Sequence, residues 1–244
     1  MKRQKRKRRP LRRWVRGALL LFTCFLLYHG GIFLGGTLKE AFFSETDKNA
    51  ETMDSSAFWN GSDWGTERYP DYVGSENQII YYNQEDPRWG EETYGPVDKI
   101  SDAGCGPTVL AMAVSSFTEN RIDPKEMCVW AYVNGYCSVG SGSYHTLIAE
   151  GLEHFGIETT VTNSSNAVKD ALKNGKPVIA LMGEGHFTSG GHFILLCELD
   201  ENEKVTVADP KSAERTKKKW DFAIIAEEAK MSPAAGVAFW ILEV

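Results

Sequence analysis

The chain has 244 residues, 42% of them hydrophobic and 25% charged, which is typical of a globular protein and leaves room for one domain, an anchor and a linker. Ten of its 27 basic residues lie between Lys2 and Arg16, and no acidic residue precedes Glu40, so residues 39–244 carry 17 basic and 33 acidic residues. The net charge of −16 on that body argues against nucleic-acid binding, because nucleic-acid-binding domains are basic.

The basic segment, residues 1–16, is followed directly by an uncharged stretch, residues 17–38. As an α-helix this stretch would be ~33 Å long at ~1.5 Å per residue, and a membrane's hydrocarbon core is ~30 Å thick. Basic residues prefer the cytoplasmic flank of such a helix. We therefore expect a single-pass anchor in the cell membrane, with the N-terminus in the cytoplasm and everything after Lys39 outside.

A cleaved signal peptide is the alternative to an anchor, and it would make the protein secreted. The densest apolar run, Ala18 to Tyr28, is short enough for the apolar core of a signal peptide. No Ala-x-Ala site follows it, however, and the basic region is long. These two features favour the anchor.

Residues 39–76 are rich in Ser, Asp, Glu, Asn and Gly and show no sustained hydrophobic period, so they are predicted to form an acidic, polar linker. The segment also holds several aromatic residues, which leaves open whether part of it packs on the domain. The folded domain is predicted to span residues 77–244.

Two helices are indicated in the first half of this domain. The first runs from Cys105 to Phe117, with Pro107 suited to its first turn and apolar residues at helical spacing. The second begins at Asp123-Pro124, and Glu126, three residues after Asp123, completes a capping-box pattern.

Two more helices and four strands follow. The helices end at Gly156 and Gly175, since glycine commonly terminates a helix. Because helices come first and strands mostly later, the pattern indicates an α+β fold rather than alternating units. The predicted ranges are helices at 144–155 and 166–174 and strands at 177–182, 192–199, 204–208 and 237–242.

The segment Ala103-Gly104-Cys105-Gly106-Pro107-Thr108 places a cysteine between small residues where a loop enters a helix. A helix N-terminus offers unpaired N–H groups and a partial positive charge, which favour the thiolate, the nucleophilic form of cysteine. The glycines would let a substrate backbone approach closely. Cys105 is therefore the candidate nucleophile; a buried cysteine that merely packs is the alternative.

A thiolate nucleophile needs a base and a group that orients the base. The strands predicted at 192–199 and 204–208 flank a polar turn and should form a hairpin. His192 begins the first strand, and Asp209 lies at the end of the second. If the turn spans residues 200–203, Asp209 lies opposite Ile194, and His192 and Asp209 are diagonal neighbours ~7–8 Å apart on one face. A turn of odd length would place them on opposite faces.

Gln84 completes the set, because a glutamine amide can donate a hydrogen bond to the oxyanion that forms when a thiolate attacks a carbonyl. Together these residues resemble the papain-fold cysteine peptidases related to bacteriocin leader-processing peptidases, and more closely their stand-alone, secreted or membrane-tethered bacterial relatives. The resemblance covers about Tyr81 to Val244. It is carried by Gln84 with Asp86-Pro87-Arg88-Trp89, Gly104-Cys105-Gly106-Pro107-Thr108, Gly191-His192-Phe193 and Asp209-Pro210.

The resemblance implies a papain-like α+β fold, with the cysteine helix packed on an antiparallel sheet, and hydrolysis of a peptide bond through an acyl-thioester. By position, Cys105 would attack, His192 would shuttle the proton, Asp209 would orient His192, and Gln84 would form the oxyanion hole with the Cys105 N–H. The leader-processing enzymes are fused to a cytoplasmic transporter. Here we infer an external domain and no transporter, so the double-glycine leader is not carried over as substrate.

Other residues are candidates for related roles. His186, in a glycine-rich loop, is the second candidate base, and Asp102 either perturbs Cys105 or caps a turn. Cys128 and Cys137 either form a disulfide, which an oxidising compartment permits, or are two buried thiols. No Cys-x-x-Cys or His-Glu-x-x-His pattern is present, so we expect no metal site and no cofactor.

Three functions compete. The first is a peptidase acting on peptides or proteins at the cell surface. The second keeps the fold but hydrolyses or transfers acyl groups at cell-wall amides. The third is a non-catalytic binding module, which the intact set of Gln84, Cys105, His192 and Asp209 argues against. The sequence does not indicate the oligomeric state.

Overall fold

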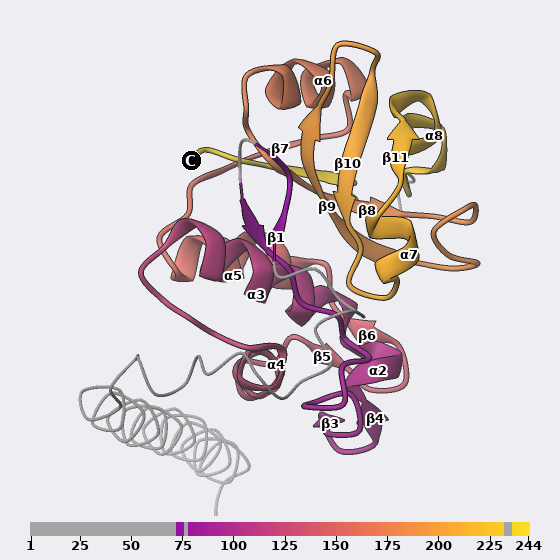
Figure 1. Ribbon diagram of the computed structural model, residues 1–244. Coiled ribbons are helices and arrows are strands. Elements are labelled where there is room, and N and C mark those ends of the chain that lie inside the picture. Colours follow the sequence, from indigo (N-terminus) through magenta and orange to yellow (C-terminus); the bar gives the residue numbers. More distant parts are fainter. Residues whose placement is uncertain (1–71, 76–77, 232–235) are drawn as a thin grey trace, which may run out of the picture. The chain divides into compact units, whose positions relative to one another are not determined.

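The computed structural model describes residues 72–75, 78–231 and 236–244 (Figure 1). The predicted basic segment, the membrane anchor and the linker up to residue 71 lie outside these ranges. Within them, no helix combines the length and apolar character that crossing a membrane requires. The folded unit falls within Gly65–Val244.

The first half of this unit is mainly helical (Figure 1). Its central helix, α3, begins at Cys105 and ends at Phe117, as predicted. Short two-stranded ribbons lie among the helices. The elements are β1 (Tyr72–Val73), β2 (Ile79–Ile80), β3 (Thr93–Tyr94), β4 (Asp98–Lys99), α2 (Ile100–Ala103), α3, α4 (Pro124–Val133), β5 (Cys137–Ser138), β6 (Gly142–Ser143) and α5 (Thr146–His154).

The second half is built on one antiparallel sheet of six strands, in the order β11-β10-β9-β8-β12-β7. The predicted antiparallel sheet and α+β class are thereby confirmed. Its elements are β7 (Thr159–Thr162), α6 (Ser165–Lys173), β8 (Val178–Met182), β9 (His192–Leu199), β10 (Lys204–Ala208), α7 (Ala213–Thr216), β11 (Lys219–Asp221), α8 (Phe222–Glu228) and β12 (Phe239–Leu242).

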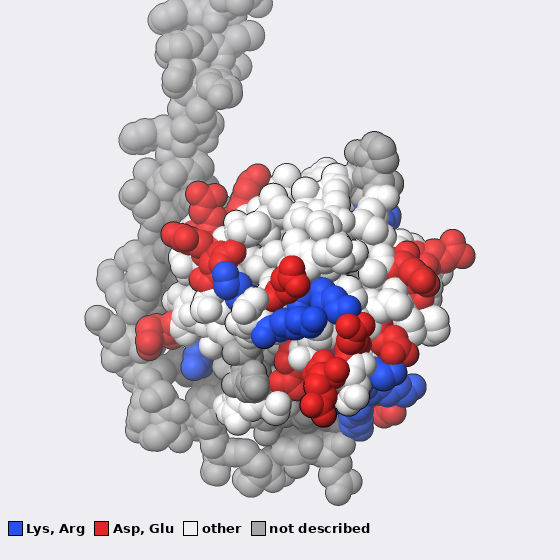
Figure 2. Space-filling view, turned by 90° about the horizontal axis from the view of Figure 1, so that it is seen from above, with Lys and Arg blue, Asp and Glu red and all other residues white. Residues whose placement is uncertain are grey.

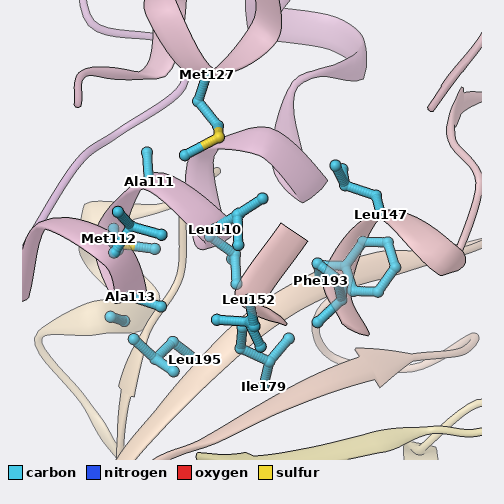
Figure 3. Close-up of a cluster of buried hydrophobic side chains, with 14 of the residues drawn as sticks. Leu110, Ala111, Met112, Ala113, Met127, Leu147, Leu152, Ile179, Phe193 and Leu195 are labelled. Carbon is cyan, nitrogen blue, oxygen red and sulfur yellow. The ribbon is translucent and has the colours of Figure 1, made fainter. Parts of the chain in front are cut away.

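Helix α3 is buried on nearly every side because it lies between the sheet and the other helices. One face of the sheet packs on it, and Leu110 and Met112 of α3 belong to the same buried cluster as Phe193 and Leu195 of β9 (Figure 3). The other face packs on α6 and α8. Each such aliphatic or aromatic side chain contributes about 1.5–3 kcal/mol on burial. Contacts on nearly every side therefore hold α3, the helix that begins with Cys105, in place.

Local signals explain where the helices begin. At α4 the predicted capping box is present, since Asp123 accepts from the Glu126 N–H at 2.8 Å and Glu126 accepts from the Asp123 N–H at 3.0 Å. At α3 the N-cap is Gly104, and no side chain caps the helix. A Cβ on Gly104 would be 2.5 Å from the Ile100 carbonyl oxygen, so the position admits only glycine.

The β9–β10 hairpin differs from the predicted geometry in two ways. Residues 201–203 form a three-residue loop in which Glu203 adopts a positive φ of 58°, and the strands pair Val205 with Leu199. The register then shifts between Thr206 and Val207, so that Val207 pairs with Leu196. This bulge adds one residue to β9 and cancels the parity change that the odd loop causes.

The turn end of this hairpin carries charges of both signs. Three ion pairs lie there, Lys204–Asp221 at 2.5 Å, Lys219–Asp200 at 2.9 Å and Lys169–Glu203 at 2.5 Å. Seen from above, basic and acidic side chains alternate over this end of the sheet (Figure 2). Because both members of each pair are at least partly exposed to solvent, each pair contributes only about 0–1 kcal/mol.

The close contact between Gly151 of α5 and Leu110 of α3 can be tested by substitution. A Cβ on Gly151 would be 2.5 Å from Cδ2 of the fully buried Leu110. We expect Gly151→Ala to lower the free energy of unfolding by about 1–2 kcal/mol, because overpacking costs about 1–3 kcal/mol and alanine returns only about 1 kcal/mol of helix propensity. Chemical denaturation measures the difference.

The matched control is Glu153→Ala, an exposed position on the same helix, which should change stability by less than about 0.5 kcal/mol. A Gly151→Ala protein that is more stable than wild type would show that the two helices are not in tight contact.

Candidate active site

Cys105 is a half-buried residue at the uncapped N-terminus of α3. His192 and the backbone N–H groups of Phe193 and Gly106 lie near its sulfur and stabilise the charged form of the thiol. Burial alone would raise the pKa of the thiol. The hydrogen bond and charge of His192, together with the two N–H groups, outweigh burial, so that the pKa of Cys105 is lowered.

His192 is the first residue of β9 and only 6% exposed. Its Nε2 lies 2.8 Å from Oδ1 of Asp209, which leaves Nδ1 for the sulfur of Cys105. Burial lowers the pKa of His192, but hydrogen bonds and charges from Asp209 and Cys105 raise it to about 9. At a pH above the lowered pKa of Cys105 and below about 9, Cys105 is therefore a thiolate and His192 an imidazolium.

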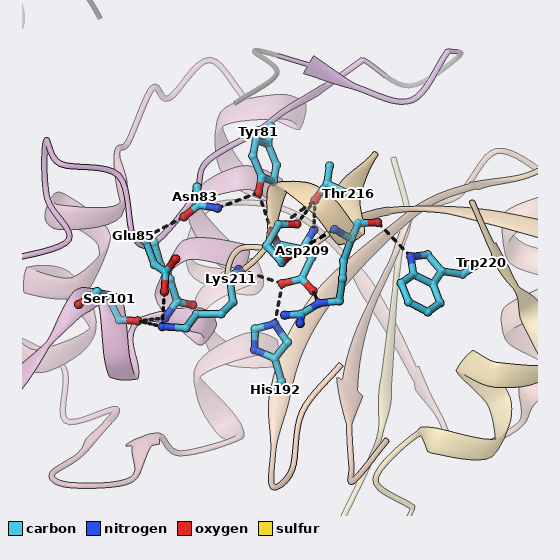
Figure 4. A network of polar contacts seen from close by, with 12 residues as sticks. Tyr81, Asn83, Glu85, Ser101, His192, Asp209, Lys211, Thr216 and Trp220 are labelled. Atoms are coloured by element: carbon cyan, nitrogen blue, oxygen red, sulfur yellow. Dashed lines mark hydrogen bonds and ion pairs between the residues drawn. The ribbon is translucent and has the colours of Figure 1, made fainter. Parts of the chain in front are cut away.

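The carboxylate of Asp209 is fully buried, just beyond the end of β10. Its Oδ1 also accepts the Lys211 backbone N–H at 2.8 Å, and its Oδ2 accepts Nε of Arg215 at 2.5 Å (Figure 4). Burial raises the pKa of this carboxyl group, but His192 and Arg215 outweigh burial and lower it. Asp209 is therefore an anion held between two cationic side chains.

The backbone of Asp209 is fixed as well. Its N–H donates to Oγ1 of Thr216 at 3.0 Å, and its carbonyl accepts the hydroxyl of Tyr81 at 2.7 Å. Thr216 and Arg215 both lie on α7, which Ser212 caps by accepting the Arg215 N–H. The sequence-based prediction missed α7. The only available signal was that serine, three residues before Arg215.

Gln84 is also buried, at 1% exposure, and its backbone N–H donates to the Pro210 carbonyl at 2.7 Å. Its side-chain Nε2 donates to the carbonyls of Ser101, at 2.7 Å, and Ile100, at 3.2 Å. Among the described residues, Oε1 has no hydrogen-bond partner. The structure thus brings Gln84 to α2, directly before the Cys105 helix, with its amide nitrogen already bound.

The Asp86-Pro87-Arg88-Trp89 motif forms the support for Gln84. Arg88 binds both carboxylate oxygens of Asp86, at 2.9 and 2.8 Å, and stacks over Trp89 at 4.3 Å. The indole N–H of Trp89 donates to the Asn83 carbonyl at 2.8 Å. A charged fork stacked on an aromatic ring closes this turn and fixes the segment that carries Gln84.

Lys211 connects the two halves of the site. Its ammonium donates to the Ser101 carbonyl at 2.5 Å and pairs with Glu85 at 2.7 Å (Figure 4). The Ser101 carbonyl thus accepts from both Lys211 and Gln84. The loop after Asp209 and helix α2 are held together through this one carbonyl group.

The other candidates lie elsewhere. His186 is bound to Glu228 through both its backbone N–H and its ring, whereas His192 is the histidine that lowers the pKa of Cys105. Asp102 is exposed on α2. Cys128 and Cys137 are free thiols, and burial raises the pKa of both. No group of three or more potential metal ligands occurs in the part of the chain that the structure describes.

Comparison with known proteins identifies a family. Residues 76–233 match the model of the Peptidase_C39 like family. Among curated proteins, none matches the chain.

The solved structures that are similar to this chain include two peptidases. The peptidase domain of Streptococcus ComA, a bifunctional ABC transporter involved in quorum sensing, is 18% identical with a TM-score of 0.44, over 60% of this chain and 94% of that one. A double-glycine-motif protease from an AMS/PCAT transporter, in complex with its leader peptide, is 14% identical with a TM-score of 0.41, over 68% of this chain and 93% of that one.

The contact between Cys105 and His192 can be tested without a substrate. We expect His192→Ala to slow alkylation of Cys105 by iodoacetamide at pH 7 by at least ~10-fold. Only the two backbone N–H groups then oppose the effect of burial, so the thiol pKa rises, and each pKa unit changes the thiolate fraction about tenfold. Mass spectrometry of the labelled peptides gives the rate.

Cys137 serves as the internal control, because it is half-buried and should react at the same rate in both proteins. Equal labelling of Cys105 in wild type and variant would mean that His192 does not activate the thiol.

Proposed function

Because the chain belongs to the Peptidase_C39-like family, we propose that it is a cysteine peptidase whose catalytic triad is Cys105, His192 and Asp209. The observation that carries the proposal is the continuous chain of contacts from the Cys105 sulfur through the His192 imidazole to the buried Asp209 carboxylate. That arrangement supplies a thiolate, a proton carrier and an orienting anion, which is what acyl transfer to sulfur requires.

In the proposed reaction the Cys105 thiolate attacks the carbonyl carbon of a peptide bond. The His192 imidazolium gives its proton to the departing amine, and an acyl-thioester remains on Cys105. Neutral His192 then takes a proton from water as the oxygen attacks the thioester. The carboxylic acid leaves, and the proton on His192 restores the thiolate–imidazolium pair. Asp209 keeps the imidazole oriented throughout, through the 2.8 Å bond to Nε2.

We propose that the backbone N–H of Cys105 and an N–H of Gln84 stabilise the oxyanion formed in each attack. Gln84 Nε2 carries two hydrogens, and its two acceptors are the carbonyls of consecutive residues, Ile100 and Ser101. One three-centre hydrogen bond satisfies both carbonyls and leaves the second N–H for the oxyanion.

We further propose that the enzyme acts outside the cytoplasm, on peptides or proteins at the cell surface. This rests on the uncharged stretch of residues 17–38 behind a basic segment, which is the pattern of an anchor with its N-terminus inside. The acidic body of residues 39–244 would then face the exterior.

Comparison of surface peptides tests the activity and its location together. Cells carrying the full-length wild-type protein should release peptides that cells carrying Cys105→Ala do not, because without the sulfur no acyl-thioester forms. Mass spectrometry of the cell-surface fraction identifies them.

Cys137→Ala is the matched control, since it also removes a half-buried thiol, and it should behave as wild type. Identical peptide sets from wild-type and Cys105→Ala cells would contradict the proposal. If instead only peptidoglycan fragments differed, the enzyme would be a cell-wall amidase.

The role of Gln84 gives a second prediction. We expect Gln84→Ala to lower kcat on the Cys105-dependent peptides by roughly 10²–10³-fold, the usual cost of losing one oxyanion donor. Alkylation of Cys105 by iodoacetamide should stay within about twofold of wild type, because that reaction forms no oxyanion.

Asn83→Ala, which disturbs the same buried segment without removing the amide of Gln84, is the control for general disruption. A Gln84→Ala variant that loses alkylation and turnover equally would assign Gln84 a structural role only.

A further inference from the structure

We infer that Arg215 is a positioning residue of the triad: by sharing the charge of the Asp209 carboxylate, it lets His192 release its proton during turnover. This inference rests on the proposed function and deepens it. Nothing in the motifs around Cys105, His192 or Asp209 pointed to Arg215, and its placement comes from the four-residue helix α7.

The geometry divides the Asp209 carboxylate between two partners. Oδ1 faces Nε2 of His192 at 2.8 Å, and Oδ2 faces Nε of Arg215 at 2.5 Å. The carboxylate has no exposed surface, and the Arg215 side chain is 24% exposed. Arg215 therefore covers Asp209 on the side away from His192 and reaches solvent itself.

The charged and titratable groups around this pair come from several elements. His192 faces Asp209 from β9, Cys105 lies next to His192 at the start of α3, and the Tyr81 hydroxyl donates to the Asp209 carbonyl. The ammonium of Lys211 points away, to Glu85 and Ser101. Apart from His192, Arg215 is thus the cation in ion-pair contact with Asp209 among the described residues.

Turnover requires His192 to become neutral when it protonates the leaving amine. At that moment Asp209 loses its imidazolium partner, and a buried carboxylate without a counter-ion is strongly unfavourable. Without Arg215, the pair would avoid this state by keeping the proton on His192. With Arg215 in place, Asp209 remains paired, and neutral His192 is available as the base for the attack of water.

Arg215→Gln tests this, because glutamine retains a hydrogen-bond donor but not the charge. The measurement is the rate of Cys105 alkylation by iodoacetamide against pH, which needs no substrate. Removing a positive charge makes each nearby proton loss harder. We therefore expect the proton losses from Cys105 and from His192 both to move to higher pH. For His192 the shift should be about one pH unit, a tenfold change in its acid dissociation constant.

Arg215→Lys retains the charge and should leave the profile close to wild type. Lys217→Gln removes an exposed cation two residues away and should leave it unchanged. An Arg215→Gln profile that superimposes on wild type would overturn the inference, as would equal shifts in the Gln and Lys variants. A wild-type Cys105 that titrates like an ordinary thiol would instead refute the proposed function.

If Arg215→Gln does not fold, the same comparison is made in an Asp209→Asn background, where no buried carboxylate needs a cation. In that background the charge of Arg215 still favours proton loss from His192. The pH profile of Cys105 alkylation should therefore lie at higher pH in Asp209→Asn/Arg215→Gln than in Asp209→Asn alone. Coincident profiles of these two proteins would refute the role of the charge.

Discussion

The site depends on one buried anion, the carboxylate of Asp209. An ionised carboxylate without exposed surface is stable only when hydrogen-bond donors and cations surround it. Its donors come from the start of β9, from the loop after β10 and from α7, in the form of His192, the Lys211 N–H and Arg215. The end of the hairpin, the loop and the short helix are therefore fixed together, and His192 is oriented toward Cys105 as a result.

The same residue connects the two halves of the fold through its main chain. The Asp209 carbonyl accepts the Tyr81 hydroxyl, and the next carbonyl, of Pro210, accepts the backbone N–H of Gln84. Lys211 then reaches the Ser101 carbonyl on α2. The segment with Gln84 and the strand end with Asp209 cannot move independently, so the proposed oxyanion donor and the proposed triad keep one geometry.

Elements with strong local signals were predictable from the sequence, and those formed by tertiary contacts were not. Helix α3, with Pro107 in its first turn, and strands β9 and β10 were predicted with their observed bounds. Helices α2 and α7 have four residues each, too few for a hydrophobic period. Arg215 was missed because it reaches Asp209 from helix α7, which was not predicted. The hydrogen bonds of the Gln84 amide were missed because their acceptors lie on α2, which was not predicted either. The catalytic roles themselves stay predictions.

The hairpin shows why residue parity alone is an incomplete guide to such a site. An odd loop, with Glu203 at positive φ, would by itself place His192 and Asp209 on opposite faces of the sheet. The extra residue that the bulge inserts near Cys197 reverses that change, so the two side chains meet. Bulges also increase strand twist. Because neither feature suffices without the other, a one-residue change in the loop would separate His192 from Asp209 although all three residues of the proposed triad remained present.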